Sequence, residues 1–398
     1  MKSTCPNRCE ICGAADWEVV LENHGPSVCS GRELVQNDTP LVKSLCRGCG
    51  FVITSQSPLD TQLDDYYRAS YSSKLKTQAY DYINFSKGKR FGEAVNDFVL
   101  SHDFSERGRM LDIGCGKGLF ERAFRAAYPR WEVEGVDPSE RSIEIARQVA
   151  PHADFHCRKF TGADFPARSY DLIAMHTVIN RAAPRTFVGD AAGLLKEGGA
   201  LSVAVAILPE APFELYFADH HYMYFRAHVL ALAEEFGFQL VSRDEVGSIW
   251  RYLFRKTDAK LCHWRGALAG QAGRICDEAR RMAQDWRDLF ATLERLRDEG
   301  KSLAFYGAGT TLMILLAQTD FPRSQIIGLF DDNPCKHGEQ IWGRTIQPRS
   351  CALQDADAVV LCAGPGGVDV MRRTLDLPRE RLVHFGMPAS ARLAALGA

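Results

Sequence analysis

The sequence lacks any uninterrupted apolar stretch near the roughly 20 residues that a membrane-spanning helix needs. Its opening residues, MKSTCPNRCEICG, lack the apolar centre of a secretory signal, so we expect a cytoplasmic protein. It also lacks an excess of one charge, because 48 Lys and Arg residues are balanced by 50 Asp and Glu residues. Binding to nucleic acid or to an anionic membrane by bulk charge is therefore not expected. We expect a small-molecule partner.

Internal repeats and low-complexity tracts are absent too. The 398 residues are 46% hydrophobic and 25% charged, which is typical of a globular chain with two or three domains. We expect a cysteine-rich module over residues 1–75, a large α/β domain over 76–256, a helical connector over 257–300 and a smaller α/β domain over 301–398.

The two α/β domains are predicted from strand-length apolar runs that alternate with helical stretches. The first domain contains RMLDIGC, WEVEGVD, YDLIAMHTV and ALSVAVAIL, and the second contains SLAFYGAG, QIIGLFDDN, DAVVLCAG and LVHFGMP. This alternation predicts a parallel, doubly wound sheet with helices on both faces. Between the domains, about forty residues without proline carry apolar side chains at helical spacing, which predicts a long amphipathic helix.

Cysteine is abundant and concentrated at the start of the chain. Six of the 13 cysteines lie within the first 49 residues, and four of them form two C-x-x-C pairs: Cys9, Cys12, Cys46 and Cys49. Two such turns can supply the four thiolates of a tetrahedral structural zinc site. In a reducing compartment this spacing favours Zn²⁺ over disulfides, with free core thiols or a redox pair as the alternative.

A glycine-rich turn follows the first strand of the large domain. In MLDIGCGKGLF the strand ends at Asp112, and Gly114, Gly116 and Gly118 lead into a helix. Glycines let a ligand approach the backbone closely, and the helix start offers free N–H groups. The next strand ends in GVDPS, where Asp137 can accept both hydroxyls of a ribose. The pattern therefore indicates an adenosine-type cofactor.

An acidic residue at the end of the first strand, as in LDIGCGKG, resembles class I S-adenosylmethionine-dependent methyltransferases. The resemblance implies a Rossmann-like methyltransferase fold, with Asp112 near the methionine amino group. Pro138 and His176, at the ends of neighbouring strands, are expected to bind the cofactor as well. A dinucleotide in the same loop stays an alternative.

The whole chain resembles the zinc-containing sugar C-methyltransferases, which act on nucleotide-linked 4-keto-deoxysugars. Beside the cysteines and the glycine turn, DDNPCKHGEQIWGRTIQP is similar to the D-x-N-P-x-K-x-G pattern of that family's third domain. The resemblance implies that this smaller Rossmann-like domain binds the substrate nucleotide near Gly307, Asp332, Asn333 and Lys336.

The resemblance also implies catalytic residues. The segment ADHHYMYF matches a family Y-x-E-H-x-x-Y-F pattern, which makes His221 the candidate base and places His220 and Tyr224 beside it. Arg181 stands where the family has a second histidine. Tyr71, from YYRASYSS, is the preferred tyrosine. A neutral histidine with a pKa near the working pH suits proton removal, and a neighbouring donor suits the developing oxyanion.

These expectations describe a methyltransferase that uses S-adenosylmethionine to methylate a nucleotide-linked sugar next to its keto group. O- or N-methylation of a related sugar or small metabolite is the close alternative, because His221 could also deprotonate a hydroxyl or an amine. In this chain Ala218 and His220 replace the family's tyrosine and glutamate. A methyltransferase-like binding protein without catalysis is therefore the third possibility.

Overall fold

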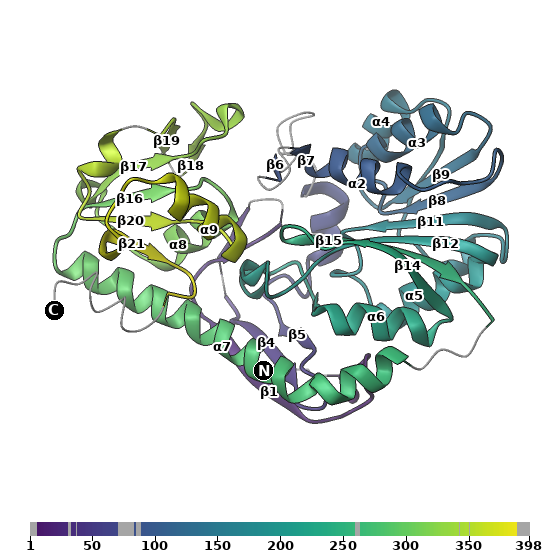
Figure 1. Cartoon of the computed structure of the whole chain (residues 1–398), viewed down its shortest axis with the longest axis horizontal. Coiled ribbons are helices and arrows are strands. Elements are labelled where there is room, and N and C mark those ends of the chain that lie inside the picture. Colours follow the sequence, from purple (N-terminus) through teal and green to yellow (C-terminus); the bar gives the residue numbers. More distant parts are fainter. Residues whose placement is uncertain are drawn as a thin grey trace.

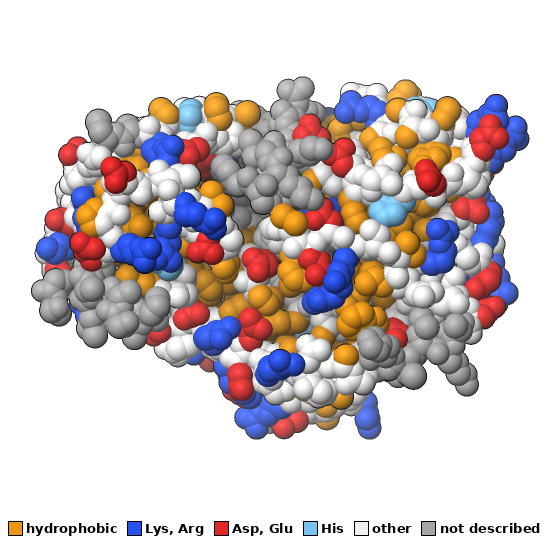
Figure 2. All heavy atoms as spheres, in the orientation of Figure 1, with side chains coloured by type: hydrophobic (Ala, Val, Ile, Leu, Met, Phe, Trp, Pro, Cys, Tyr) orange, Lys and Arg blue, Asp and Glu red, His pale blue; other side chains and the backbone are white. Residues whose placement is uncertain are grey.

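A computed structural model of the chain describes residues 6–30, 33–36, 38–70, 83–84, 89–258, 263–341, 343–349 and 351–387. Three sheets and one long helix organise these residues (Figure 1). Two α/β lobes lie side by side, and the N-terminal strands and the long helix lie along one side of both. On the face drawn in Figure 2, acidic and basic side chains are interspersed over both lobes.

The N-terminal sheet is antiparallel and has four strands. Their spatial order is β1 (Trp17–Asn23), β4 (Leu41–Cys46), β5 (Val52–Gln56) and β13 (Tyr222–Met223). A separate hairpin joins β2 (Ser27–Val28) to β3 (Leu34–Val35), and a second joins β6 (Ile83–Asn84) to β7 (Lys89–Arg90). After β5 come α1 (Leu63–Asp65) and a π-helical turn, Tyr66–Ser70. Because β13 comes from much later in the chain, the sheet joins the N-terminal module to the large domain.

The large domain is built on a seven-stranded sheet. Its spatial order is β10 (Asp154–Cys157), β9 (Glu132–Asp137), β8 (Arg109–Ile113), β11 (Tyr170–His176), β12 (Leu195–Ala206), β15 (Ile249–Lys256) and β14 (Phe238–Asp244). The first five strands are parallel, and β15 is antiparallel to both neighbours. The central strands are buried on both faces, as continuous apolar runs in parallel sheets require. The strand order places the ends of β8, β9 and β11 together at one edge.

Helices cover both faces of this sheet, which makes it doubly wound. Figure 1 shows α3 and α4 on one side and α5 and α6 on the other. The helices are α2 (Phe91–Leu100), α3 (Leu119–Ala127), α4 (Glu140–Val149), α5 (Pro184–Leu194) and α6 (Arg226–Glu235), and a short 3₁₀ turn spans Pro212–Tyr216.

The smaller lobe repeats the α/β plan on a six-stranded sheet. The spatial order is β18 (Gln340–Ile341), β19 (Arg344–Gln347), β17 (Ile326–Phe330), β16 (Leu303–Tyr306), β20 (Ala358–Leu361) and β21 (Leu382–His384), with α8 (Thr310–Gln318) and α9 (Pro365–Thr374). All paired strands are parallel except β18.

One 36-residue helix, α7 (His263–Asp298), connects the lobes. Its buried apolar side chains recur at helical spacing, and Trp286 at the centre is fully buried. The Trp286 indole donates to the Pro212 carbonyl at 2.9 Å, and its ring packs against Phe385 of the smaller lobe. The helix therefore contacts all three parts of the molecule. In the part of the chain that the structure describes, no helix combines the length and the apolarity that crossing a membrane requires.

Two glycines, each directly after a cysteine pair, differ in how closely α7 packs against them. Gly13 and Gly50 both have φ near +80°, at +77° and +80°. A Cβ on Gly50 would lie 2.4 Å from Cγ2 of Ile275 on α7, whereas a Cβ on Gly13 would meet nothing within 4 Å. The two positions thus share backbone strain and differ in packing.

We expect Gly13→Ala to lower the free energy of unfolding by roughly 1–2 kcal/mol, the strain of a left-handed alanine. Gly50→Ala should lose a further ~1–3 kcal/mol because the methyl group overpacks against Ile275. Urea unfolding of both variants measures the difference. Equal losses would contradict the packing of α7 on this turn.

Candidate functional site

The glycine turn is held against the next strand by one carboxylate. Gly114, Gly116 and Gly118 all have positive φ, at +80°, +52° and +74°. The Gly116 amide donates to Oδ2 of Asp137 at 3.1 Å, and the Ser139 amide donates to Oδ1 at 2.8 Å. Asp137 therefore fixes the turn after β8 relative to the end of β9, which is where the sequence predicts a ribose.

Space is left open at the middle of this turn. A Cβ on Gly114 would lie 2.1 Å from Cγ1 of Val178, so that position tolerates only glycine. A Cβ on Gly116 would meet nothing within 4 Å, which leaves its backbone open to a ligand. Pro138 follows Asp137 at the same edge and is half-buried.

Two further acids lie buried beneath the turn. Asp112, the last residue but one of β8, has 3% of its surface exposed, and Glu121 on α3 is fully buried. Burial, followed by repulsion from Asp137, raises the pKa of Asp112 to about 8. Burial and repulsion from Asp112 raise the pKa of Glu121 well above its usual range. None of the ion pairs formed among the described residues involves Asp112 or Glu121. Such a pocket suits a cationic ligand.

His176 lies at the end of β11, beside this pocket. Its Nε2 is 2.9 Å from the Ser202 hydroxyl, and its ring meets Phe120 edge-to-face with centroids 4.8 Å apart. Burial, and next the charge of Arg251, lower the pKa of His176 to about 3. The imidazole is therefore neutral at pH 7 and adds no positive charge to the acidic pocket.

A second polar cluster adjoins the first through Arg181. Asp219 is fully buried and accepts bonds from the Ser30 amide at 2.8 Å and from the Tyr67 hydroxyl at 3.0 Å. Arg181 donates to the Ser30 hydroxyl at 3.1 Å, and its guanidinium lies 5.3 Å from the Tyr67 ring centroid. Burial raises the pKa of Asp137 despite the charge of Arg181, whereas the charges of His220 and Arg181 and the bonds from Ser30 lower the pKa of Asp219 despite its burial. The loop that carries Arg181 contacts the glycine turn through Val178 and the histidine segment through the Asn180 carbonyl.

The two candidate histidines differ in their partners. His220 is buried, and its Nδ1 lies 2.5 Å from Oε2 of Glu214, which is buried too. Nε2 of His221 is buried and has no hydrogen-bond partner among the described residues. Burial and the charge of Lys43 lower the pKa of His221, so its imidazole is neutral at pH 7. Its backbone amide donates to the Asn180 carbonyl, next to Arg181, at 2.8 Å.

Among the described residues, the predicted catalytic residue Tyr224 does not join this cluster. Tyr224 is fully buried in the core, where its hydroxyl donates to the Ile179 carbonyl at 3.0 Å. This bond and the packing of its ring on Phe51 give Tyr224 a structural role. Tyr71 lies outside the described residues, and Tyr67 is the tyrosine that contacts Arg181.

The predicted nucleotide-binding residues of the smaller lobe surround a different acid. Asp331, just after β17, accepts bonds from the amides of Ala308 and Asn333 at 2.7 and 2.8 Å and from Lys336 Nζ at 2.9 Å. Gly307, with φ +104°, precedes Ala308. Asp332 accepts a bond from the Tyr306 hydroxyl at 2.5 Å, and the Asn333 side chain accepts from the Cys335 amide. The four predicted positions thus lie at one edge of the smaller sheet, in the other lobe from the glycine turn.

The four predicted metal-ligating cysteines do converge. Cys9 and Cys49 have sulfurs 3.7 Å apart, Cys12 and Cys46 have sulfurs 3.5 Å apart, and all four lie within 4.8 Å of one another. A tetrahedral ion with bonds of about 2.3 Å places its sulfurs roughly 3.8 Å apart, so the residues fit Zn²⁺. The same distances are far from the ~2 Å of a disulfide.

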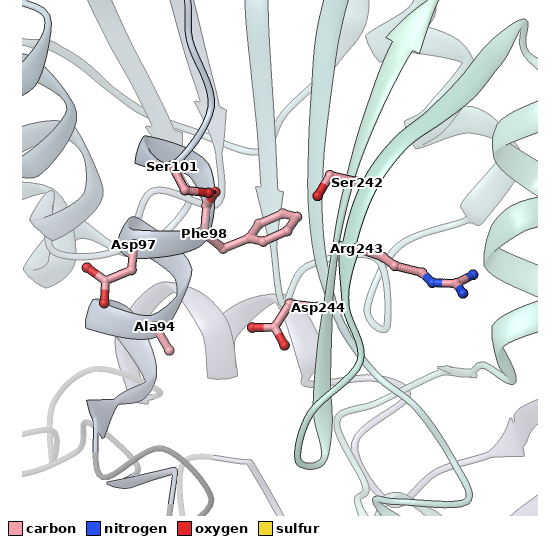
Figure 3. A pocket seen from close by; sticks show the side chains of 7 residues that line it. All are labelled: Ala94, Asp97, Phe98, Ser101, Ser242, Arg243 and Asp244. Atoms are coloured by element: carbon pink, nitrogen blue, oxygen red, sulfur yellow. Dashed lines mark hydrogen bonds between the residues drawn. The ribbon is translucent and has the colours of Figure 1, made fainter.

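An open hollow of about 430 Å³ lies elsewhere on the large domain, between α2 and β14. Figure 3 shows Asp244 turned toward α2 and Arg243 turned away from it. The hollow is lined by Ala94, Asp97, Phe98, Ser101, Ser242, Arg243 and Asp244. None of these is a predicted site residue.

Three residues around the second cluster escape sequence reasoning: Ser30, Lys43 and Glu214. Tyr67 belongs to the YYRASYSS stretch, where Tyr71 is the preferred candidate, and Asp219 lies in the ADHHYMYF segment without being singled out. The one available signal was charge, because Asp219 and Glu214 occur in an otherwise apolar and aromatic stretch where acids are rarely buried without a partner.

Comparison with known proteins places a methyltransferase domain at residues 85–243. A ubiquinone biosynthesis O-methyltransferase of Bradyrhizobium sp. (strain ORS 278) is 36% identical over 101 residues, covering 24% of this chain and 39% of that protein. The ribosomal RNA large subunit methyltransferase G of Psychromonas ingrahamii is 33% identical over 90 residues, covering 21% of this chain and 23% of the relative. This chain thus spans well under half the length of these relatives.

Solved structures with partial likeness include an O-methyltransferase family protein from Burkholderia thailandensis, with TM-score 0.35, 13% identity and coverage of 42% of this chain and 55% of the other. A geranyl diphosphate methyltransferase in complex with GPP and sinefungin has TM-score 0.37 and 12% identity, covering 42% of this chain and 79% of that one. Residues 85–243, which match a methyltransferase domain, contain the glycine turn, Arg181 and His221.

The raised pKa of Asp112 predicts how stability depends on pH. An unfolded aspartate titrates near 3.8, whereas folded Asp112 holds its proton up to about pH 8. The unfolded chain therefore binds fewer protons across this window, and wild type loses stability as the pH rises from about 4 to about 8. Asp112→Asn cannot titrate, so its advantage over wild type should grow through that window, to on the order of 2 kcal/mol.

Urea unfolding between pH 4 and 9 measures this difference. Asp357→Asn is the matched control, because hydrogen bonds from Ser302 lower the pKa of Asp357 below its unfolded value of 3.8, so its difference from wild type should stay nearly constant between pH 4 and 9. An Asp112→Asn difference that does not vary with pH would contradict the buried acid pocket.

Proposed function

We propose that this protein is an S-adenosylmethionine-dependent methyltransferase that methylates a nucleotide-linked keto sugar at the carbon next to the ketone, with His221 as the base. The observation that carries the proposal is the adjacency of two clusters. Buried acids lie beneath an open glycine turn, and Arg181 links them to a neutral histidine whose Nε2 has no partner among the described residues.

The charges of the first cluster favour this cofactor over a dinucleotide. S-adenosylmethionine carries a sulfonium and an ammonium, and when bound it supplies an electrophilic methyl group. Burial keeps Asp112 and Glu121 protonated when no ligand is bound, and the cations of a bound donor would favour loss of these protons and pair with the carboxylates. The pyrophosphate of a dinucleotide would bring more negative charge to the same place, at a cost that the low dielectric increases. Asp137 keeps free lone pairs on both oxygens for ribose hydroxyls.

The second cluster supports proton removal. Neutral His221 can take the proton from the carbon next to the ketone, because burial keeps its pKa low and leaves Nε2 as an acceptor. The electron pair of the broken C–H bond would form the new bond to the methyl carbon, while the pair of the broken C–S bond would stay on the donor sulfur, which would leave as a neutral thioether. Arg181 supplies positive charge for the oxygen that gains negative charge meanwhile.

A nucleotide-linked sugar is supported by the smaller lobe and by the resemblance of the chain. The lobe presents Gly307, Asp332, Asn333 and Lys336 at one edge of its sheet. In open parallel sheets this edge is where nucleotides bind. We propose that it binds the nucleotide while the sugar reaches His221.

O-methylation is the second candidate. It is favoured by relatives that are named O-methyltransferases, which match about a quarter of this chain. On a hydroxyl substrate the same His221 would remove the hydroxyl proton, and no enolate would form.

The test is incubation of the protein with a panel of nucleotide sugars and methyl-labelled S-adenosylmethionine, followed by mass spectrometry. We expect a labelled product, and a substrate deuterated at the carbon next to the ketone should lose one deuteron from that carbon if the reaction is C-methylation. His221→Gln should lower kcat by about 10²–10⁴-fold while cofactor affinity by calorimetry stays unchanged. His24→Gln, at an exposed histidine paired with Glu22, is the control.

Three outcomes decide between the alternatives. A labelled product that keeps all the deuterium of a substrate deuterated next to the ketone assigns the reaction to oxygen or nitrogen. Unchanged turnover in His221→Gln removes His221 as the base. Wild-type protein that fails to bind S-adenosylmethionine points to a binding protein without catalysis and overturns the proposal.

We further propose that Cys9, Cys12, Cys46 and Cys49 hold one structural Zn²⁺. All four positions are filled by protein sulfur, so the ion would stabilise the module without taking part in the reaction.

Elemental analysis should find one zinc per chain in wild type and none in Cys46→Ser, with a lower Tm in the variant because metal binding contributes to folding. Cys29→Ser, at a buried cysteine outside the cluster, should keep the metal. Metal-free wild-type protein with an unchanged Tm after chelation would contradict the zinc assignment.

A further inference from the structure

We propose that the N-terminal module is part of the catalytic apparatus, because Lys43 and Thr54 are positioning residues that hold the His220–His221 backbone. The inference rests on the proposed function and deepens it, since it assigns a task to a module that otherwise only carries a metal. Neither residue belongs to the cysteine pairs, the glycine turn or the histidine segment.

The histidine segment is attached to the module as a strand. β13, which directly follows His221, pairs with β5, with Tyr222 opposite Ile53 and Met223 opposite Val52. The Thr54 amide extends the ladder by donating to the His221 carbonyl at 2.9 Å. The position of His221 is thus set by strand β5 of the module as well as by its own domain.

Two buried side chains add bonds to the same segment. Thr54 donates its hydroxyl to the His220 carbonyl at 2.5 Å. Lys43 donates from Nζ to the Thr54 hydroxyl at 2.7 Å, to the Phe217 carbonyl at 2.7 Å and to the His220 carbonyl at 3.2 Å. Protonated Lys43, whose pKa burial lowers to about 7, has three N–H bonds for these three acceptors, of which one is a carbonyl of the histidine segment and one is the carbonyl of Phe217 just before it.

The burial of Lys43 indicates that this arrangement does more than fill space. Lys43 is fully buried, and burying an ammonium costs several kcal/mol in general. A leucine or a methionine would fill the same volume without that cost. What only the lysine provides is a fixed set of donors on the Phe217 and His220 carbonyls, which orients the turn that presents the histidines.

The metal cluster lies at the end of the same hairpin. Lys43 is on β4, which ends at Cys46, and Thr54 is on β5, which begins three residues after Cys49. Lys43 and Thr54 are direct partners in the β4–β5 ladder. A metal held by Cys46 and Cys49 would fix the turn of this hairpin, and with it the pair that holds the histidine segment. Metal loading then sets the position of His221 and leaves the glycine turn unaffected.

The first test compares Thr54→Val with Thr54→Ser in the full chain. Valine keeps the shape and removes the hydroxyl, whereas serine keeps the hydroxyl. We expect Thr54→Val to shift the ring resonances of His220 and His221 in ¹H–¹³C NMR spectra and to speed amide exchange over residues 217–223 about tenfold, as the loss of one hydrogen bond does. Thr54→Ser should restore the wild-type values, and calorimetric S-adenosylmethionine affinity should be unchanged in both variants.

The second test removes the metal from wild type with a chelator and follows amide hydrogen exchange by mass spectrometry. Faster exchange over residues 217–223, with unchanged exchange over 110–118, supports the proposal. Equal exchange in both states, or a Thr54→Val variant with wild-type histidine resonances, overturns it. These readouts need no substrate, so they stand or fall separately from the methyl-transfer assay that tests the proposed function.

Discussion

The bridge that Asp137 makes between Gly116 and Ser139 is the contact on which the candidate site depends. It joins the turn after β8 to the end of β9, and so fixes an open backbone position beside an acid at the edge of a parallel sheet. Because Gly114 packs against Val178 and Gly116 faces open space, the turn has one conformation and one accessible side. The neighbouring strand ends then supply Asp112 and His176 to the same place.

Charge distinguishes the two halves of the site. The glycine turn is underlain by acids whose pKa values are raised by burial, which suits a ligand with positive charge. The histidine segment instead combines a fully buried acid, a lysine and Arg181 around a neutral imidazole. The charge of Arg181 affects a carboxylate in each half, Asp137 in the first and Asp219 in the second. This division of charge matches a methyl donor with a cationic centre at the glycine turn and an acceptor that loses a proton at the histidine segment.

Sequence reasoning predicted the features that are local in the chain. The glycine turn, the paired cysteines and the amphipathic pattern of α7 each depend on short-range spacing, and each occurs where the pattern indicates. The contacts around Asp219 could not be predicted, because Ser30, Tyr67 and Arg181 meet only after the two parts have docked. Likewise β13 has two residues, too few for a periodicity that would reveal its pairing with β5.

Two further residues, Asp331 and Tyr224, show the same limit of prediction from sequence. Among the acids after β17, Asp331 rather than Asp332 holds the glycine turn of the smaller lobe, because the residue directly after the strand points inward. Tyr224 lies in the predicted histidine segment, yet its hydroxyl is used inside the core. Residue type and motif position identify a segment, whereas the direction of each side chain depends on the packing around it.

The central claim is that the turn at Gly114–Gly118 binds an adenosyl sulfonium donor. A crystal structure of the protein with S-adenosylhomocysteine tests it most directly. The account predicts that the ribose hydroxyls lie within hydrogen-bond reach of Asp137 and that the amino group lies near Asp112. A ligand bound elsewhere, or a nicotinamide dinucleotide that displaces it from this turn, would contradict the account.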